Sequence, residues 1–290
     1  MKVSIVTPSF NQGPFLERTL RSVLCQDHRD IEYIVVDGAS TDDTSNVLER
    51  YRRHLDHVII EKDRGQADAL NKGFRLATGD VLAYLNSDDC YADPGVVSRI
   101  VRHFTDPAVD VVYGCRLYIS EAGQFMNVAP HAPFDAATLR RADYIAQECA
   151  FWSRRIFERA GPRLDDSFQF ALDYELWMRF LAHGARFVAI ADEVGLFRCH
   201  ESQKSIARWH DVGLPEIARL QRAHGVEPST ELEMRRLFED HMHGTGRAGR
   251  LRLYLHQQKA IWRGRLRRWT RRPPLDSWCL EAPLPGRIRD

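Results

Sequence analysis

The sequence predicts an α/β fold in which a mostly parallel central sheet is flanked by helices. Between residues 2 and 89, short β-branched apolar runs alternate with segments whose apolar residues fall at helical spacing. Each apolar run ends in a polar cluster, as expected where a strand leaves a buried sheet. Strands and helices that alternate at these lengths are joined by right-handed crossovers, which leave the strands parallel. With 290 residues, 44% of them hydrophobic, the chain is long enough to bury a sizeable core.

The N-terminal part contains three strand-and-helix units followed by a fourth strand. The first strand is stopped by Pro8, and the helix after it has Leu16, Leu20 and Val23 at helical spacing. The second strand runs into a polar loop at residues 37–43. We predict strands at residues 2–7, 31–36, 57–60 and 81–85, and helices at residues 14–26, 44–53 and 66–77.

The alternation loosens after a further strand at residues 111–113. From about residue 207 the sequence is helical and charged, and it ends in a Pro-rich tail. The later elements that we expect are a helix at residues 154–160, an amphipathic helix at 173–183 and a strand at 186–190. We therefore divide the chain into residues 1–115, residues 116–206 as a second half of the same domain, and residues 207–290 as a helical, basic C-terminal extension.

The composition disfavours several classes of protein. The six cysteines form no CxxC pair, which argues against a zinc ribbon or a disulfide framework and indicates reduced thiols. No stretch approaches the roughly 18 apolar residues of a membrane span. The first ten residues lack the long apolar region and cleavage site of a secretory signal. We therefore expect a cytoplasmic protein.

Polar clusters follow the carboxyl ends of the four N-terminal strands, at the edge where open α/β sheets bind ligands. The strongest of them is Asn86-Ser87-Asp88-Asp89. Adjacent carboxylates repel one another unless a cation or hydrogen-bond donors compensate, and such oxygens suit Mg²⁺ or Mn²⁺ bridging a diphosphate. An ordinary solvated turn is the alternative for this Asp pair.

Two other clusters at the same edge suit an anionic nucleotide. Residues 63–73 gather acids, amides and a base around a helix start, where N–H groups and the helix dipole favour anions. Asp37 ends the second strand, and its oxygens can accept hydrogen bonds from a nucleotide base or a ribose hydroxyl. The alternatives are an ordinary capped helix that stops at Gly73 and a simple Asp-Gly turn.

In their order and spacing, residues 7–11, 36–42, 63–73 and 85–89 resemble glycosyltransferase family 2 with the GT-A fold. The resemblance is strong over residues 1–115 and weaker to about residue 205. It implies an inverting transferase that uses a nucleotide diphosphate sugar, with a UDP-sugar favoured, and a divalent ion, Mn²⁺ or Mg²⁺. The first half of the chain would then bind the donor, and the second half would bind the acceptor and supply the base.

The same resemblance gives individual donor residues their roles. Pro8 and Ser9 would line the base and ribose, and Asp37 would read the base. Asp63 would also sit by the base, and Lys72 would lie near the diphosphate.

The resemblance also implies a metal site. Asp89 would be a metal ligand, Asp88 would lie close to the ribose and sugar, and His200 resembles the family's late histidine at the metal or diphosphate site, although a lone histidine is often structural. Asn86 stands where many relatives have a further Asp, which weakens a metal role for this position. The full predicted nucleotide-sugar site is Pro8, Ser9, Asn11, Asp37, Asp63, Asp68, Asn71, Lys72, Asn86 and Asp88.

Asp173 is the predicted catalytic residue. In resembling enzymes an acid here is the general base, and direct displacement needs such a base on the face opposite the leaving diphosphate. A first-turn helix acid is the structural alternative, and Glu175 is a second candidate base or acceptor contact. Gln147, Glu148 and Trp152 suit acceptor recognition, although Trp152 suits a core position equally well.

Residues 247–272 contain ten Lys or Arg and no Asp or Glu, in a chain of net charge +1. Leu255, Trp262, Leu266 and Trp269 fall on one helical stripe, which suits a helix lying on anionic lipid. We expect peripheral binding to the cytoplasmic face of a membrane. A solvated helix packed on the domain and a subunit contact are alternatives. Nucleic acid is not expected, because no recognised nucleic-acid motif accompanies the charge.

These observations predict sugar transfer to a hydroxyl of a glycan or lipid-linked glycan, in cell-surface polysaccharide synthesis. A sugar nucleotidyltransferase should show a Gly-rich, basic loop after the first strand, whereas residues 8–13 contain no Lys or Arg. A nicotinamide dehydrogenase is disfavoured because no GxGxxG follows that strand. A catalytically silent glycan- or membrane-binding protein of the same fold is the remaining alternative, against which the retained carboxylates argue.

Overall fold

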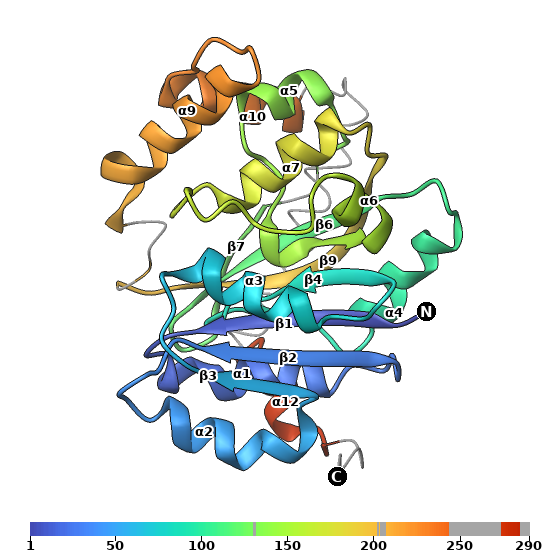
Figure 1. Ribbon diagram of the computed structural model, residues 1–290, viewed down its shortest axis with the longest axis vertical. Coiled ribbons are helices and arrows are strands. Elements are labelled where there is room, and N and C mark those ends of the chain that lie inside the picture. Colours follow the sequence, from blue (N-terminus) through green and yellow to red (C-terminus); the bar gives the residue numbers. More distant parts are fainter. Residues whose placement is uncertain (130–131, 202, 204–206, 244–273, 285–290) are drawn as a thin grey trace.

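The computed structural model describes residues 1–129, 132–201, 203, 207–243 and 274–284. The basic segment of residues 247–272, and with it the predicted membrane helix, lies outside the described residues. In the described part, nine strands form one sheet in the order β3-β2-β1-β4-β8-β6-β9-β5, with β7 paired to β6 (Figure 1). The strands are β1 Val3–Ser9, β2 Ile31–Asp37, β3 His57–Ile60, β4 Val81–Tyr84, β5 Cys90–Tyr91, β6 Val111–Ser120, β7 Phe125–Ala129, β8 Ala150–Ser153 and β9 Phe187–Cys199.

Helices cover both faces of this sheet. The α-helices are α1 Gly13–Leu24, α2 Thr44–Tyr51, α3 Gln66–Leu76, α4 Val96–Val101, α5 Ala136–Arg141, α6 Arg154–Arg159, α7 Leu172–Ala182, α9 Leu214–Ala223, α10 Glu231–His243 and α12 Ser277–Glu281. Short 3₁₀ turns lie at Arg52–His54, Arg102–Thr105 and Gln147–Cys149, and a π turn lies at Trp209–Gly213. The α/β fold with a central sheet is therefore confirmed.

The sheet changes character at β4. From β3 through β2 and β1 to β4 every pair is parallel, as the strand-and-helix alternation predicts. Beyond β4, the pairs β4–β8, β8–β6 and β9–β5 are antiparallel and only β6–β9 is parallel. The predicted strands at residues 111–113 and 186–190 are the starts of the much longer β6 and β9, whose later parts contain Gly and charged residues that break the apolar pattern.

Alternate residues of the parallel strands pack into two hydrophobic clusters, one on each face of the sheet. Ile5 and Val35 pack with α1, α2 and α4 on one face. Val6 and Ile34 pack with α3, α6 and α7 on the other. A Cβ at Gly73 would come within 2.4 Å of Val6 Cγ1, so this glycine lets α3 approach β1 and does not stop the helix. The parallel strand ends are thereby held in fixed positions.

The division at residue 115 falls inside β6, so the first two predicted parts share one sheet. The helical character predicted after residue 207 is present in α9 and α10, and α10 packs against α5 in the upper half of Figure 1. Residues 274–284, which include α12, lie in the lower half beside α1.

Within the described residues, no helix is long and apolar enough to cross a membrane. The six cysteines, all of them described, are free thiols, as predicted.

Candidate active site

A cleft with a volume of 830 Å³ opens along the carboxyl ends of the parallel strands and extends to α9 and α10. The predicted residues that line it are Pro8, Ser9, Asp63, Asn86, Asp88, Asp89, Gln147, Glu148, Asp173 and His200. Five segments distant in sequence, at residues 8–9, 63, 86–89, 147–148 and 200, thus meet in one cavity with the start of α7. The structure brings the central part of the predicted site together.

The Asp88–Asp89 pair lines the cleft. Asp88 Oδ2 is 3.0 Å from His200 Nε2, and Asp89 is 1% exposed. Thr19 of α1 fixes the loop by donating from Oγ1 to the carbonyl oxygens of Ser87 at 2.9 Å and Asp89 at 2.7 Å. Burial, followed by repulsion from Asp88 and Glu148, raises the pKa of Asp89 well above its ordinary value.

This donor set fits a divalent cation, because Asp88 and Glu148 repel the buried Asp89 carboxylate and hard oxygen ligands suit Mg²⁺ or Mn²⁺. A cation between oxygen ligands would offset this repulsion. In the described residues, no three His, Cys, Asp or Glu side chains are gathered as a complete set of ligands. Metal ligation by Asp89 and His200 therefore stays a prediction.

Beside the acid pair, the ends of β1 and β2 and the tight turns that follow them form one wall of the cleft. Asp37 is 0% exposed, and its carboxylate accepts hydrogen bonds from the N–H and Oγ of Ser40 at 2.8 and 2.6 Å. Asn11, at φ 54°, accepts from the Thr41 N–H at 2.9 Å. A Cβ at Gly38 would lie 2.7 Å from Asp63 Oδ2, so this glycine allows the two loops to touch. Asp37 and Asn11 therefore shape the wall and do not themselves line the cleft.

Ser9 and Phe10 continue this wall into the cavity. Ser9 is 4% exposed, and within the described residues its Oγ has no hydrogen-bond partner. Phe10 is 59% exposed. An unsatisfied buried hydroxyl beside an exposed ring is the arrangement expected where a ligand completes the contacts.

Three residues predicted from the 63–73 stretch do not line the cleft. Asn71 exchanges hydrogen bonds with the backbone of Leu164 at 2.7 and 2.9 Å. Lys72 Nζ pairs with Glu61 at 2.9 Å and with Asp68 at 3.7 Å. Gln66 and Ala69 of the same helix line the cleft instead, so the contacts of Asp68, Asn71 and Lys72 serve the fold in this structure.

Asn86 joins the two sides of the cleft through amide groups. Gln66 Nε2 donates to Asn86 Oδ1 at 2.7 Å, and Asn86 Nδ2 donates to Gln147 Oε1 at 3.1 Å. Gln147 in turn donates to the carbonyl oxygen of Tyr84. An ionised Asp at position 86 has no proton to donate to Gln147, which gives a physical reason for the amide in this chain.

Asp173 lies half-buried in the first turn of α7 and lines the cleft. Its Oδ1 accepts a hydrogen bond from the Tyr174 N–H at 2.9 Å. Burial raises the pKa of Asp173, hydrogen bonds from backbone N–H groups and the charge of Arg116 lower it in part, and Glu148 adds to the rise. A carboxylate with a raised pKa is a stronger base than an ordinary Asp.

The sequence reasoning missed Arg116 and Asp143, which line the cleft. Arg116 forms two hydrogen bonds to the Glu148 carboxylate, one of them from Nη2 to Oε2 at 2.7 Å. Desolvation within the cleft, followed by the charge of Asp173, raises the pKa of Asp143. Arg116 could have been singled out from the sequence, because it is a charged residue within the otherwise apolar strand at residues 111–119. Asp143 lies in no comparable sequence pattern.

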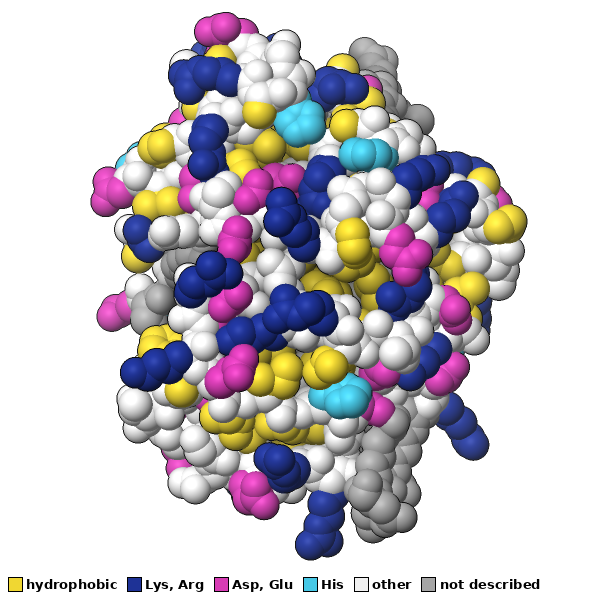
Figure 2. All heavy atoms as spheres, in the orientation of Figure 1, with side chains coloured by type: hydrophobic (Ala, Val, Ile, Leu, Met, Phe, Trp, Pro, Cys, Tyr) yellow, Lys and Arg dark blue, Asp and Glu magenta, His cyan; other side chains and the backbone are white. Residues whose placement is uncertain are grey.

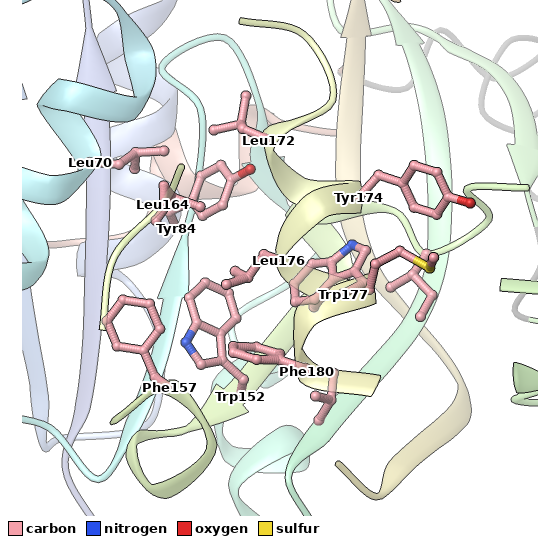
Figure 3. Packing of buried hydrophobic residues seen from close by; sticks show 14 of the residues in the cluster. Leu70, Tyr84, Trp152, Phe157, Leu164, Leu172, Tyr174, Leu176, Trp177 and Phe180 are labelled. Carbon is pink, nitrogen blue, oxygen red and sulfur yellow. The ribbon is translucent and has the colours of Figure 1, made fainter. Parts of the chain in front are cut away.

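Two predicted acceptor contacts lie elsewhere. Trp152 is 0% exposed and packs in the core against Phe157, Trp177 and Phe180 (Figure 3). The alternative of a core tryptophan is therefore the correct one. Glu175 is paired with Arg179 at 2.8 Å on another face of α7 and does not line the cleft.

Comparison with known proteins places this geometry in a family. The family model described as Glycosyl transferase family 2 matches residues 4–183, which is more than half of the chain. The chain belongs to glycosyltransferase family 2. Parts of this family 2 chain are similar to curated bacterial proteins. It is 41% identical over 90 residues to the putative teichuronic acid biosynthesis glycosyltransferase TuaG of Bacillus subtilis, covering 30% of this chain and 36% of that protein.

A second relative of this family 2 chain is a PGL/p-HBAD biosynthesis glycosyltransferase of Mycobacterium tuberculosis. It is 30% identical over 163 residues, which cover 55% of this chain and 62% of that protein. The chain thus matches less than two thirds of the length of either relative.

Solved structures agree with the GT-A fold of this family 2 chain. S. aureus TarS, residues 1–349 in complex with UDP-GlcNAc, has a TM-score of 0.64 at 17% identity and covers 86% of this chain and 74% of that one. The mannosyltransferase PcManGT from Pyrobaculum calidifontis, in complex with GDP-Man and Mn²⁺, has a TM-score of 0.60 at 19% identity and covers 96% and 83%. At these identities the likeness shows the fold alone.

Proposed function

We propose that this family 2 protein moves a sugar from a nucleotide diphosphate sugar, with a UDP-sugar favoured, to a hydroxyl of a glycan or lipid-linked glycan, with inversion. One observation carries the proposal: the cation-suited pair Asp88–Asp89 and the half-buried Asp173, whose pKa is raised, share one cleft. The relatives named for teichuronic acid and PGL/p-HBAD biosynthesis support a role in cell-surface polysaccharide or glycolipid synthesis.

Each side of the cleft has a separate task in this proposal. The donor wall, which we define as Pro8, Ser9, Asp63, Asp88 and Asp89, would hold the nucleotide and sugar. Its unsatisfied Ser9 hydroxyl supports ribose or base contact. Asp89 with His200 would hold Mn²⁺ or Mg²⁺, which when bound offsets charge on the leaving diphosphate. All five residues of this wall lie in residues 1–115, the half for which we predict donor binding.

The acceptor wall, which we define as Arg116, Asp143, Gln147, Glu148 and Asp173, would receive the sugar acceptor. Asp173 would take the proton from the attacking hydroxyl as it displaces the diphosphate from the opposite face, which inverts the anomeric centre. The Arg116–Glu148 pair and the Gln147 amide offer hydrogen bonds to neighbouring hydroxyls. Residues 116–206 supply this wall, and α9 and α10 close its outer side.

The decisive experiment is a panel of nucleotide sugars, each with Mn²⁺, with Mg²⁺ and with a chelator. Stabilisation would be measured by thermal shift and turnover by release of nucleoside diphosphate. We expect at least one donor to raise Tm and to be turned over only with metal. The proposal fails if no donor stabilises the wild-type protein with metal, or if Asp89→Ala leaves turnover intact.

We propose further that residues 247–272 bind an anionic membrane surface on the cytoplasmic side. On the face shown in Figure 2, Lys and Arg side chains are interspersed with Asp and Glu side chains. The ten cations of residues 247–272, by contrast, have no acid among them.

Truncation before this segment is a poor test, because it would also remove residues 274–284, which pack on α1. The suitable variant keeps the full chain and replaces the ten basic residues by Gln. Co-sedimentation with vesicles of mixed phosphatidylserine and phosphatidylcholine should fall strongly, with donor turnover in solution retained. Undiminished binding would remove the membrane proposal without affecting the proposed chemistry.

A further inference from the structure

Residues 274–284, which we call the docking strap, pack against α1. Arg21 of α1 holds the strap by donating from Nε to the Cys279 carbonyl oxygen at 2.6 Å. Asp276 of the strap is 0% exposed and accepts from Arg18 Nη1 at 2.8 Å. It also accepts from Arg198 Nη2 at 2.6 Å, in an ion pair that is completely buried on both sides.

Arg198 is the direct link between the strap and the Asp88–Asp89 pair. Its backbone N–H donates to Asp89 Oδ1 at 3.1 Å, and its Nε donates to the Asp88 carbonyl oxygen at 2.9 Å. Its Nη1 donates to the Glu121 carbonyl oxygen at 2.9 Å. One buried guanidinium therefore fixes the loop after β4, the turn after β6 and the strap relative to one another.

The charge of Arg198 makes Asp276 more than a packing contact. A buried guanidinium without a counter-charge is strongly unfavourable. Asp276 supplies that charge, so the Asp89 carboxylate, which already accepts the Arg198 N–H, is left for a ligand in the cleft. Without Asp276, the guanidinium would be balanced by the carboxylates that the proposed cation needs.

Two local features show that the strap is fitted to this place. The turn residue Gly123 has φ +79°, and a Cβ there would lie 2.2 Å from Asp276 Oδ1, so only glycine leaves room for the carboxylate. The Gly123 carbonyl oxygen also accepts the Leu275 N–H at 2.9 Å. Helix α1 couples the same parts, because Arg18 and Arg21 hold the strap while Thr19 holds the loop of the acid pair.

We propose that Asp276 is a positioning residue for the donor and cation site, acting through Arg198. The inference rests on the proposed function, since it assigns Asp276 to the site that Asp88 and Asp89 form. Asp276 itself does not line the cleft. It keeps Arg198 neutralised, and Arg198 keeps the two acids in their binding geometry.

The test compares Asp276→Asn, Arg198→Lys and the double variant Asp276→Asn with Arg198→Met in the full chain. Asp110→Asn is the matched control. Asp110 is also buried, at 3% exposed, and pairs with Arg155 at 2.8 Å, but it precedes β6 and does not line the cleft. Each protein is measured for Tm, for kcat, for the donor KM and for the Mn²⁺ concentration that gives half-maximal rate.

We expect Asp276→Asn and Arg198→Lys each to raise the donor KM and the half-maximal Mn²⁺ concentration about tenfold. The double variant should regain much of the lost Tm, because both buried charges are gone, but not the lost affinities, because the Nε donor to Asp88 is missing. Asp110→Asn should lower Tm with both affinities unchanged.

If Asp276→Asn keeps the wild-type affinities for donor and Mn²⁺, or if the double variant recovers them fully, the strap only stabilises the fold. If Asp276→Asn alone does not fold, the double variant and Arg198→Lys decide together, and wild-type affinities in either one would show that Asp276 does not position the acid pair through Arg198. If the proposed function is wrong, the result differs from failure of this inference, because the wild-type protein itself would then turn over no nucleotide sugar.

Discussion

On the donor wall, the residues lie at the end of the parallel strand β1 and on the loops that follow the parallel strands β3 and β4. On the acceptor wall, they come from β6, the turn before β8 and the first turn of α7, which are far apart in sequence. The two walls also differ in charge. The donor wall holds the adjacent carboxyl groups of Asp88 and Asp89, whereas in the acceptor wall the Arg116 guanidinium lies among Glu148, Asp143 and Asp173. The first arrangement suits a cation and a diphosphate, and the second suits a neutral acceptor and a base.

The largest loss is expected when the donor wall loses its buried acid. Asp89→Asn should lower kcat/KM by at least about a thousandfold, because a cation that stabilises a leaving diphosphate is worth several kcal/mol. Release of nucleoside diphosphate at saturating Mn²⁺ measures the effect. Glu175→Gln is the control, since Glu175 is paired with Arg179 outside the cleft, and its activity should stay within about twofold. A large loss in the control would restore the acceptor role predicted for Glu175.

On the acceptor wall, Asp173→Asn should lower kcat by about a hundredfold or more, the usual contribution of a general base. The amide can still accept the Tyr174 N–H, so the helix start and Tm should change little. Because burial raises the pKa of Asp173, wild-type activity should fall on the acid side at a pH above the ordinary Asp value of about 3.9. A normal kcat in the variant would remove Asp173 as the base.

The difference between the walls explains how far the sequence could predict the site. Consecutive strand-and-helix units fix where Asp88 and Asp89 must lie, because parallel strand ends meet at one edge. Arg116 and Asp143 reach the cleft only through the antiparallel strands and turns beyond β4, whose order local periodicity does not encode. Arg198 and Asp276, separated by 78 positions, meet only in the folded chain. The fold of the first half was therefore predictable from the sequence. The side-chain contacts between residues far apart in the chain were not.

Glu148→Gln should shift the pH profile and leave the donor wall intact. Glu148 raises the pKa of Asp173, and its loss also frees Arg116, which lowers that pKa. Both effects act in the same direction, so the acid limb of kcat should move to lower pH. We also expect the acceptor KM to rise about tenfold, as for a lost charge-assisted hydrogen bond of roughly 1.4 kcal/mol. An acid limb that moves to higher pH would contradict the charge arrangement.

Trp152→Phe should separate core packing from acceptor recognition. The tryptophan packs against Phe157, Trp177 and Phe180, and within the described residues its indole N–H has no partner. Loss of ring volume should cost about 1–2 kcal/mol of unfolding free energy, visible in urea denaturation. The acceptor KM should not change, and a tenfold increase would place the ring in acceptor binding after all.

The smallest effect is expected at Lys72, which the sequence placed near the diphosphate and the structure pairs with Glu61 and Asp68. Lys72→Met should raise the donor KM by less than about threefold, because Lys72 is held by Glu61 and Asp68 and does not line the cleft, and an ion pair with the exposed Glu61 contributes little. Donor titrations at fixed Mn²⁺ would measure this, with Arg64→Met, which removes another cation that pairs with Asp68, as the control. An increase of tenfold or more in Lys72→Met alone would mean that Lys72 leaves its acids when a diphosphate binds. The donor wall would then include α3, and the ends of the parallel strands alone would not explain how the donor is bound.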